Sequence, residues 1–363
     1  ARHDGLAAAL FTRAVLSDPK VEALLLAIRT ALLGQESPDQ NFLRMIAWQW
    51  HLRDYAAVVS ADEAAQLQAL GTASTGSPMA GGGPISNPIN SLKRALYENP
   101  ATGRADHNDT QDPWLHAVIT RRQQEQALAK DLPSTGGDDK GDRVRAQYEQ
   151  HPYPRWLGLT VPTPGSRRAL IMRATGDTSW RDRSLQVLIA GCGTGRHALM
   201  AALGYGPRTN TLAIDISRTS LGYAARMAET YKVKTLGFAH GDLRDLTKLP
   251  PGCLPAKGFD VIESIGVLHH LPDTAEGLIA LAEHLKPGGV IQLGLYRAGG
   301  RRHVALARAE IEDLGLDGTK DDDIRQYRAH VLARPAHEIF PALAHNRDFY
   351  SLAGCRDLLF HAR

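Results

Sequence analysis

The chain has 363 residues, enough for two domains that each bury a hydrophobic core. Its 42 lysine and arginine residues against 39 aspartate and glutamate residues give a net charge of +3, too small to indicate a nucleic acid or an anionic membrane as a partner. The three cysteines, Cys192, Cys253 and Cys355, are scattered and outline neither a disulfide framework nor a metal site, so we expect a reduced, cytoplasmic protein without a metal.

The composition of the chain contains no membrane or export signal. No run of about 18 apolar residues occurs, so we expect no transmembrane helix. The first residues, Ala1 to Asp4, include no initiator methionine and are not followed by the basic region and apolar core of a signal peptide. We therefore expect an N-terminus that has been trimmed.

The first hundred residues have the pattern of short amphipathic helices. Asp18 and Pro19 supply an N-cap and a first-turn proline for apolar residues at helical spacing as far as Gly34. Residues 37–40 and 60–63 each fit a capping box, in which a serine precedes a glutamine or glutamate by three positions. These signals predict an all-helical N-terminal domain.

Two polar segments interrupt the helical pattern. Residues 71–84 consist mainly of Gly, Ser, Thr and Pro, which predicts a flexible linker, and a second polar break spans residues 134–142. No clean repeat of about 34 residues is found, although residues 96–100 are weakly similar to a tetratricopeptide repeat. We place the helical domain at residues 1–132 and a second domain at residues 143–363.

From Leu185 onward, apolar strands alternate with helical stretches. Strands that recur roughly every 25 residues are what βαβ units produce, with right-handed crossovers and helices on both faces of the sheet. The sequence therefore predicts an α/β fold with a Rossmann-like, doubly wound, mostly parallel sheet. The predicted strands are residues 186–190, 211–216, 235–239, 259–265 and 290–296.

Three glycines at alternate positions, Gly191, Gly193 and Gly195, follow the first of these strands. Such a turn lets backbone N–H groups approach a polar ligand closely, because glycine has no Cβ and tolerates positive φ. A dinucleotide fingerprint would place its third glycine at position 196, which is Arg196, so the spacing excludes that motif. The spacing instead resembles motif I of class I S-adenosylmethionine-dependent methyltransferases.

Further segments extend this resemblance over residues 144–296. Residues 259–271 are similar to motif IV of the family and the segment after it, and residues 286–289 resemble the Lys-Pro-Gly-Gly turn that ends a helix and directs the fifth strand. The helical N-terminal region, the Tyr-Pro-Arg-Trp segment (153–156) and residues 347–361 resemble a bacterial subgroup that joins tetratricopeptide-like helices to the methyltransferase.

The resemblance implies S-adenosylmethionine as cofactor, bound at the carboxyl ends of the strands. Asp215 would accept hydrogen bonds from the ribose hydroxyls; alternatively it caps the helix that starts near Arg218, a role that Ser217 can take instead. Asp242 would accept the adenine amino group, or it is an ordinary exposed loop acid. The cofactor-binding candidates are Gly191, Cys192, Gly193, Gly195, His197, Asp215, Ile216, Asp242, Leu243, Ser264 and Tyr148.

The candidates for catalysis are His269, Tyr153 and Tyr296. A neutral imidazole can take a proton from an acceptor hydroxyl or amine, which makes His269 a candidate general base. The alternative, which we favour, is that one imidazole of the His269–His270 pair packs beside the cofactor while the other hydrogen-bonds within the loop. The aromatic segment 148–156 either lies over the cofactor as a lid or docks the helices against the sheet.

Two departures from the pattern of the family stand out. Ile189 replaces the acid often found two residues before the first glycine, which removes a partner of the glycine loop but no direct cofactor contact. No pair of antiparallel strands is evident after Tyr296, although a complete class I sheet has seven strands. Either the chain is truncated or the sheet is completed differently, for example by a partner chain, and we expect the sheet edge to be covered.

These features predict a methyltransferase that acts on an O or N nucleophile of a small molecule or of a peptide or protein. Residues 263–266 read Glu-Ser-Ile-Gly, which is not the Asn-Pro-Pro-aromatic motif of enzymes that methylate amino groups of nucleic acids. No second glutamate joins Glu263 in its loop, as it does in the arginine-methylating enzymes. The alternative is a binding protein without catalysis, in which the helices recruit a partner. A homodimer is a further expectation.

Overall fold

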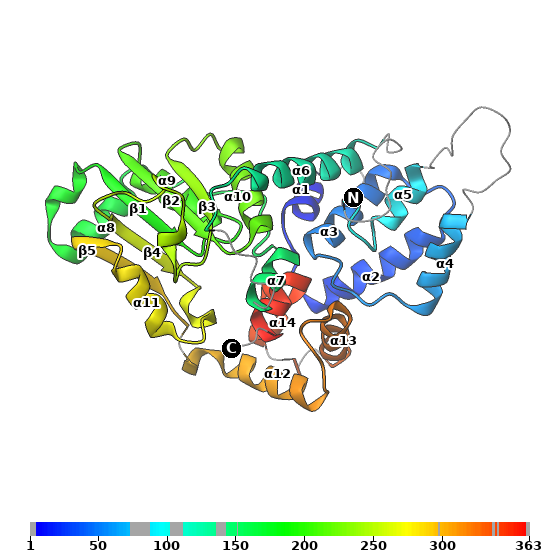
Figure 1. Ribbon diagram of the computed structural model, residues 1–363. Helices are drawn as coiled ribbons and strands as arrows, with labels where there is room; N and C mark the ends of the chain where they lie inside the picture. Colours follow the sequence, from blue (N-terminus) through cyan, green and yellow to red (C-terminus); the bar gives the residue numbers. More distant parts are fainter. Residues whose placement is uncertain are drawn as a thin grey trace. The chain divides into compact units, whose positions relative to one another are not determined.

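The chain divides into a helical unit and a sheet unit (Figure 1). The helical unit comprises residues 1–122 and 301–360, and the sheet unit comprises residues 123–300 with the last three residues. This division differs from the predicted domains, 1–132 and 143–363, because the C-terminal helices form a hydrophobic core that also takes in Ala56 and Val15 of the N-terminal region. The computed structural model describes residues 5–72, 88–101, 112–135, 143–150, 152–296, 298–335, 338–339 and 341–360.

The helices of the helical unit begin largely at the predicted capping signals. Asp18 caps α2, and Ser60 and Glu63 exchange side-chain-to-backbone hydrogen bonds of 3.0 and 3.2 Å at the start of α4, which confirms that capping box. Asp39 caps α3 in place of Ser37. The helices are α1 (Gly5–Arg13), α2 (Pro19–Gly34), α3 (Gln40–Leu52), α4 (Ala61–Thr72), α5 (Pro88–Arg94), the first part of α6 (Pro113–Lys130), α12 (Arg302–Asp313), α13 (Asp321–Leu332), α14 (Pro341–Ala344) and α15 (Leu352–Cys355).

The predicted linker at residues 71–84 falls almost entirely outside the described residues. Its first two residues end α4, and the remainder lies in the undescribed range.

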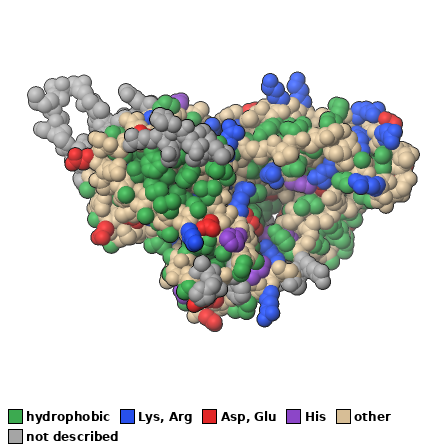
Figure 2. Space-filling model, turned by 180° about the vertical axis from the view of Figure 1, so that it is seen from behind, with side chains coloured by type: hydrophobic (Ala, Val, Ile, Leu, Met, Phe, Trp, Pro, Cys, Tyr) green, Lys and Arg blue, Asp and Glu red, His purple; other side chains and the backbone are tan. Residues whose placement is uncertain are grey.

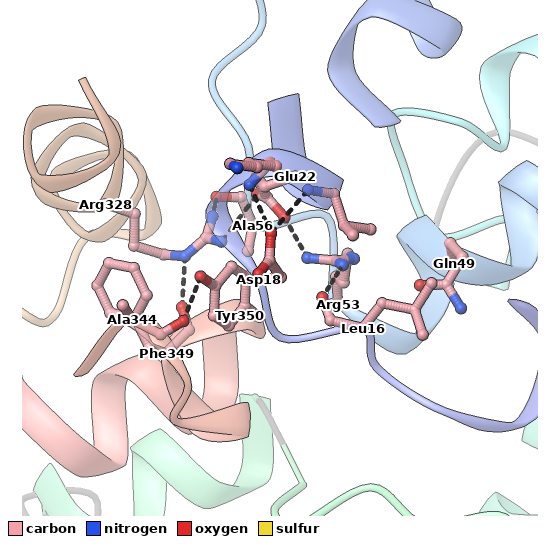
Figure 3. Close-up of polar contacts among 12 residues, drawn as sticks. Leu16, Asp18, Glu22, Gln49, Arg53, Ala56, Arg328, Ala344, Phe349 and Tyr350 are labelled. Carbon is pink, nitrogen blue, oxygen red and sulfur yellow. Dashed lines mark hydrogen bonds and ion pairs between the residues drawn. The ribbon is translucent and has the colours of Figure 1, made fainter. Parts of the chain in front are cut away.

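A buried charge network joins the C-terminal helices of this unit to its N-terminal helices (Figure 3). The Glu22 carboxylate of α2 pairs with Arg53, just after α3, and with Arg328 of α13 (2.9 Å). Arg328 also donates to the carbonyl of Phe349 (2.6 Å) and to that of Ala56. Because an unpaired buried charge is costly, each of these side chains requires the others in place. The network explains why the C-terminal helices belong to this unit.

The sheet unit contains five parallel strands in the order β3-β2-β1-β4-β5, which confirms the predicted Rossmann-like α/β fold. Alternate side chains of β1 enter two cores: Val187 and Ile189 pack with α8, α9 and α10, whereas Leu188 and Ala190 pack on the side of α11. The elements are α7 (Arg143–Gln150), α8 (Ser166–Thr175), β1 (Leu185–Ala190), α9 (Arg196–Tyr205), β2 (Thr209–Asp215), α10 (Arg218–Thr230), β3 (Leu236–His240), β4 (Phe259–Ile265), α11 (Thr274–Ala282) and β5 (Leu285–Gly294).

The fifth strand differs from the prediction at its start and at its outer edge. It begins at Leu285 and not at Val290, because residues 286–289 form an irregular step where the register with β4 shifts. Among the described residues β5 pairs with β4 alone and none of its side chains is buried, so the expected covering of this edge is not found there. The chain continues into α12 of the helical unit, and its described residues after β5 include no further strand.

The opposite edge strand, β3, is partly covered near its carboxyl end. The His240 N–H donates to the carbonyl of Pro133 (2.8 Å), and the Thr135 N–H donates to the carbonyl of His240 (3.0 Å). The predicted polar break at residues 134–142 therefore contributes its first two residues to the sheet, and residues 136–142 lie outside the described part of the chain.

The face drawn in Figure 2 carries side chains of several kinds. In Figure 2, hydrophobic side chains gather on one face of the helical unit, while basic and acidic side chains are interspersed elsewhere on the visible surface. Within the described ranges, no helix combines the length and the apolar character that a membrane crossing requires.

Candidate cofactor and active site

The glycine loop, Gly191 to Gly195, joins β1 to α9 at the carboxyl edge of the sheet. Its three glycines have φ of 75°, 52° and 81°, in the left-handed region that favours glycine. A Cβ on Gly193 would lie 2.9 Å from the carbonyl oxygen of Tyr153, and one on Gly195 would lie 2.5 Å from the Cβ of Ala224. The loop thus has no room for side chains at these positions.

Asp215, at the end of β2, is hydrogen-bonded to the glycine loop. Its carboxylate accepts hydrogen bonds from the N–H groups of Gly193 (2.7 Å) and Ser217 (2.9 Å), and the residue is 8% exposed. Ser217 caps α10 through the Ser220 N–H (3.0 Å), so the alternative role of Asp215 as the N-cap is wrong. Burial raises the pKa of Asp215 to about 6, although its hydrogen bonds with Ser217 and Gly193 oppose that shift. A perturbed carboxyl beside a ligand loop is typical of a functional group.

The acid after β3, Asp242, pairs with a neighbour that the sequence interpretation did not consider. The Arg244 guanidinium donates to both oxygens of Asp242 (2.5 to 3.1 Å), and the Arg244 backbone N–H donates as well (2.8 Å). The pair is partly exposed, whereas Leu243 between them is buried in the core. Asp242 can therefore accept a ligand amino group only by sharing its oxygens with Arg244.

Helix α7 is fastened to the start of α10. The Glu149 carboxylate accepts hydrogen bonds from the backbone N–H groups of Arg218 (2.6 Å) and Thr219 (3.0 Å), and the Ser217 hydroxyl donates to the carbonyl of Tyr148 (3.0 Å). A carboxylate at this place satisfies N–H groups that a helix start leaves unpaired. The sequence interpretation missed Glu149, whose partner lies about 70 positions away in the chain.

The aromatic segment that follows α7 lies directly against the glycine loop. The Thr194 hydroxyl donates to the carbonyl of Pro154, and the Trp156 indole N–H donates to the carbonyl of Thr194 (3.0 Å). The Tyr223 hydroxyl in turn donates to the carbonyl of Trp156. The close approach of the Tyr153 carbonyl to Gly193 completes this contact. Residues 153–156 thus pack directly against the glycine loop and are hydrogen-bonded to it.

Four aromatic side chains gather where β4 and β5 end. His269 and His270 lie in a short turn after β4 with ring centroids 4.1 Å apart, and Tyr296, which follows β5, has its centroid 4.3 Å from that of His269. Tyr148 stands edge-on to His270 at 6.4 Å. The structure therefore brings together two of the three catalytic candidates, His269 and Tyr296. The contacts that place the third, Tyr153, are those of its backbone with the glycine loop.

Three further cofactor candidates are buried or engaged by the protein. Ser264 of β4 is 0% exposed, and its hydroxyl has no hydrogen-bond partner within the described part of the chain. A buried hydroxyl without a partner is rare and marks a place where a ligand atom or water would bond. Burial raises the pKa of the Cys192 thiol well above its ordinary value, so this side chain packs as a neutral group. The carbonyl of Ile216 lies 3.1 Å from Nε2 of His240.

His197, in the first turn of α9, contacts a residue that the sequence interpretation did not select for the site. Its Nε2 lies 2.6 Å from the carboxylate of Glu263, a residue of β4. The available signal was an acidic residue with apolar neighbours on its N-terminal side, Val261 and Ile262, within a predicted strand. Within the described ranges, no group of three or more His, Cys, Asp and Glu side chains is arranged to hold a metal ion.

Residues 188–291 match a family model described as a methyltransferase domain. The chain is 32% identical over 195 residues to an uncharacterised protein of Synechococcus, a match that covers 52% of this chain and 44% of that protein. It is 33% identical over 106 residues to trans-aconitate 2-methyltransferase of Deinococcus radiodurans, covering 29% of this chain and 36% of that protein. The chain thus spans less than half of the length of these curated relatives.

Similar solved structures include the YcgJ protein from Bacillus subtilis, with a TM-score of 0.32 and 19% identity, covering 47% of this chain and 85% of that chain. They also include PKMT2 from Rickettsia typhi in complex with AdoHcy, with a TM-score of 0.33 and 19% identity, covering 44% and 31%. The family match contains the glycine loop, Asp215 and Asp242, and it spans all five parallel strands in whole or in part. Residues 188–291 therefore match a methyltransferase domain and contain most of a parallel, Rossmann-like sheet.

Proposed function

We propose that the sheet unit binds S-adenosylmethionine at the carboxyl ends of its strands and transfers the methyl group to an O or N nucleophile of a small molecule or of a peptide or protein. The observation that carries this proposal is the buried carboxylate of Asp215 against the N–H of Gly193, where β1 and β2 end. A carboxylate at this place suits the two neighbouring hydroxyls of a ribose. Both residues lie within the matched methyltransferase domain.

The residues at this edge of the sheet fit such a cofactor. The glycine loop keeps side chains away from this edge of the sheet, and Asp215 offers acceptors for ribose hydroxyls. Asp242 offers an acceptor for the adenine amino group, shared with Arg244. The hydroxyl of Ser264, which no described residue satisfies, is available to a polar atom of the ligand. When bound, the cofactor supplies an electrophilic methyl group on its sulfonium centre.

The protein's own part in the reaction is to orient the acceptor, exclude water and take up a proton. Orientation of the reacting groups can contribute about 7 to 11 kcal/mol in well-ordered systems. The imidazole of His269 can accept a proton from an acceptor hydroxyl or ammonium group, and the Tyr296 ring beside it restricts where the acceptor stands. This juxtaposition supports an enzyme over the alternative of a binding protein without catalysis.

The affinity for S-adenosylmethionine is expected to fall on acidification. The pKa of Asp215 is about 6, and protonation removes an acceptor that the ribose hydroxyls use. The Kd from calorimetric titration should be constant above about pH 7 and rise about tenfold per pH unit well below pH 6. A Kd that stays flat from about pH 8 to about pH 5 would contradict the ribose role.

The stability of the unliganded protein should change in the opposite sense over this range. The folded pKa of Asp215 exceeds its ordinary value of 3.8, so its contribution favours folding at low pH and is lost as the pH rises from about 4 to about 6. Thermal unfolding midpoints of the wild type and of Asp215→Asn, compared across this range, isolate the contribution. Parallel curves for the two proteins would show that the pKa of Asp215 is not raised.

Replacement of His269 by glutamine is expected to slow methyl transfer about a hundredfold while S-adenosylmethionine binds normally. The lost rate should recover partly at higher pH, because an acceptor that has already lost its proton needs no base. The measurement is the rate of label transfer from methyl-labelled cofactor into a cell extract. His284→Gln is the matched control, since His284 lies at the amino end of β5, whereas His269 lies beyond the carboxyl end of β4. Equal rates in both variants would reduce His269 to a packing role.

The same labelled extract distinguishes the classes of acceptor. Label in macromolecules indicates a peptide or protein acceptor, and label in the small-molecule fraction indicates a metabolite. If the protein binds S-adenosylmethionine with Asp215 intact but transfers no label to any fraction, the alternative of a binding protein is favoured instead.

A further inference from the structure

Glu263 is a fully buried carboxylate in the middle of the sheet unit. It lies on the interior strand β4, paired in register with Ile189 of β1 on one side and Gln292 of β5 on the other, and it is 0% exposed. An acidic side chain at such a place is unusual, because moving a charge out of water costs several kcal/mol unless it is paired and hydrogen-bonded. Its partners are therefore informative.

Three donors converge on this carboxylate. His197 Nε2 lies 2.6 Å from Oε2, the Tyr205 hydroxyl donates to Oε1 (2.5 Å), and the guanidinium of Arg167 lies 3.3 Å from Oε2. His197 is the second residue of α9 and Tyr205 is its last, so a single carboxylate holds both ends of that helix. Arg167 adds a contact from α8.

The donors keep the carboxylate in its charged form. Burial alone would raise the pKa of Glu263. The hydrogen bond and charge interaction with His197 oppose this shift, as do the charge of Arg167 and the hydroxyl of Tyr205. Together they lower the pKa of Glu263 below its ordinary value. A neutral glutamine in its place would keep the size of the side chain and lose the charge that orders the donors.

The position of α9 matters because the helix starts at the glycine loop. Gly195 is its N-cap, and the Leu199 N–H donates to the Gly195 carbonyl (2.9 Å). On the other side of the loop, Asp215 holds the Gly193 N–H. The loop and the first turn of α9 are thus held between two buried carboxylates, one from β2 and one from β4.

We infer that Glu263 is a positioning residue for cofactor binding: through His197 it fixes the first turn of α9 against the glycine loop. The inference rests on the proposed function, because it concerns the same site. Glu263 contacts neither cofactor nor acceptor in this role and acts through the helix start. A purely structural role would change the stability of the unit without changing the affinity for the cofactor selectively.

The test compares Glu263→Gln with a matched control, Glu125→Gln. Glu125 is also a mostly buried carboxylate of the sheet unit, paired with Arg226 at 2.8 Å. Calorimetric titration should give a Kd for S-adenosylmethionine about tenfold higher in Glu263→Gln and unchanged in Glu125→Gln. Equal Kd values in the wild type and Glu263→Gln, or equal losses in both variants, would overturn the inference.

A double-mutant cycle tests the route through His197. If Glu263 acts through that imidazole, His197→Ala combined with Glu263→Gln should raise the Kd no more than the larger single change does. Additive losses would show that Glu263 acts by another route and would overturn the inference.

Hydrogen exchange of the unliganded protein separates this inference from the proposed function. Exchange of the Leu199 amide should be about tenfold faster in Glu263→Gln than in the wild type and unchanged in Glu125→Gln. Failure of the wild type to bind S-adenosylmethionine would refute the proposed function, and the exchange rates would still decide whether Glu263 holds α9. Unchanged exchange at Leu199 would overturn the positioning role whatever the wild type binds.

Discussion

Asp215→Asn should weaken the binding of S-adenosylmethionine about a hundredfold. The asparagine keeps the size of the side chain but replaces one acceptor oxygen by an amide donor and removes the charge. A charge-assisted hydrogen bond is worth about 1.5 to 3 kcal/mol, so the loss of one such bond together with the charge accounts for this factor. Calorimetric titration of the folded variant provides the Kd, with circular dichroism to verify the fold.

Asp260→Asn is the matched control for this experiment. Asp260 lies on β4, and its carboxylate accepts hydrogen bonds from the Gln186 N–H (2.7 Å) and from the Lys286 ammonium group (2.8 Å). It thus resembles Asp215 in its partners but lies toward the amino edge of the sheet. The control should bind S-adenosylmethionine as the wild type does. Wild-type affinity in Asp215→Asn, or equal weakening in both variants, would remove the ribose assignment.

Arg168→Met should produce the largest loss of stability in the sheet unit, about 3 to 5 kcal/mol. Arg168 of α8 is 6% exposed, and methionine fills its space but leaves several buried acceptors without a donor. The thermal unfolding midpoint of this unit should fall by about 10 °C. The acceptors are the carbonyls of Tyr205 (2.8 Å), Trp180 (2.9 Å), Arg183 (2.7 Å) and Arg208 (3.0 Å) and the hydroxyl of Thr209 (3.0 Å).

Arg183→Met is the comparison for Arg168→Met. The Arg183 side chain is 41% exposed and forms a surface ion pair with Asp177, while its carbonyl still accepts from Arg168 after the change. Because an exposed ion pair contributes little, the unfolding midpoint of this variant should stay within error of the wild type. If the unfolding midpoint of Arg168→Met were as high as that of Arg183→Met, the carbonyl and hydroxyl groups that Arg168 normally bonds would have found water or other donors.

The parts of the fold that could be predicted are those set by local sequence. The glycine spacing from Gly191 to Gly195 and the apolar runs of β1 to β4 depend on neighbours within a few positions. For the same reason Ser217 could be assigned as the cap of α10 and Asp215 left for a ligand. The helical boundary at residues 60–63 was equally local.

What could not be predicted depends on contacts between distant residues. Glu263 contacts His197, which lies 66 positions away in the chain, and the residues around either one do not predict this contact. In the sequence, Ile189 stands where the family often has an acidic residue. In the structure, Glu263 of β4 is paired with Ile189 and places a carboxylate on the neighbouring strand at the same level of the sheet. The unit boundary near residue 300 was missed for a related reason. The composition of residues 301–360 does not separate them from the helices between the strands, so nothing local assigns them to the helical unit.

The division of the helical unit into residues 1–122 and 301–360 has a consequence for synthesis of the chain. The N-terminal helices leave the ribosome with Glu22 and Arg53 in place, but Arg328 follows only after the whole sheet unit has been made. Domains usually fold from the N-terminus onward. Here residues 123–300 of the sheet unit, although second to emerge, are made before the helical unit is complete, and Glu22 and Arg53 wait for Arg328 to complete their buried charge network.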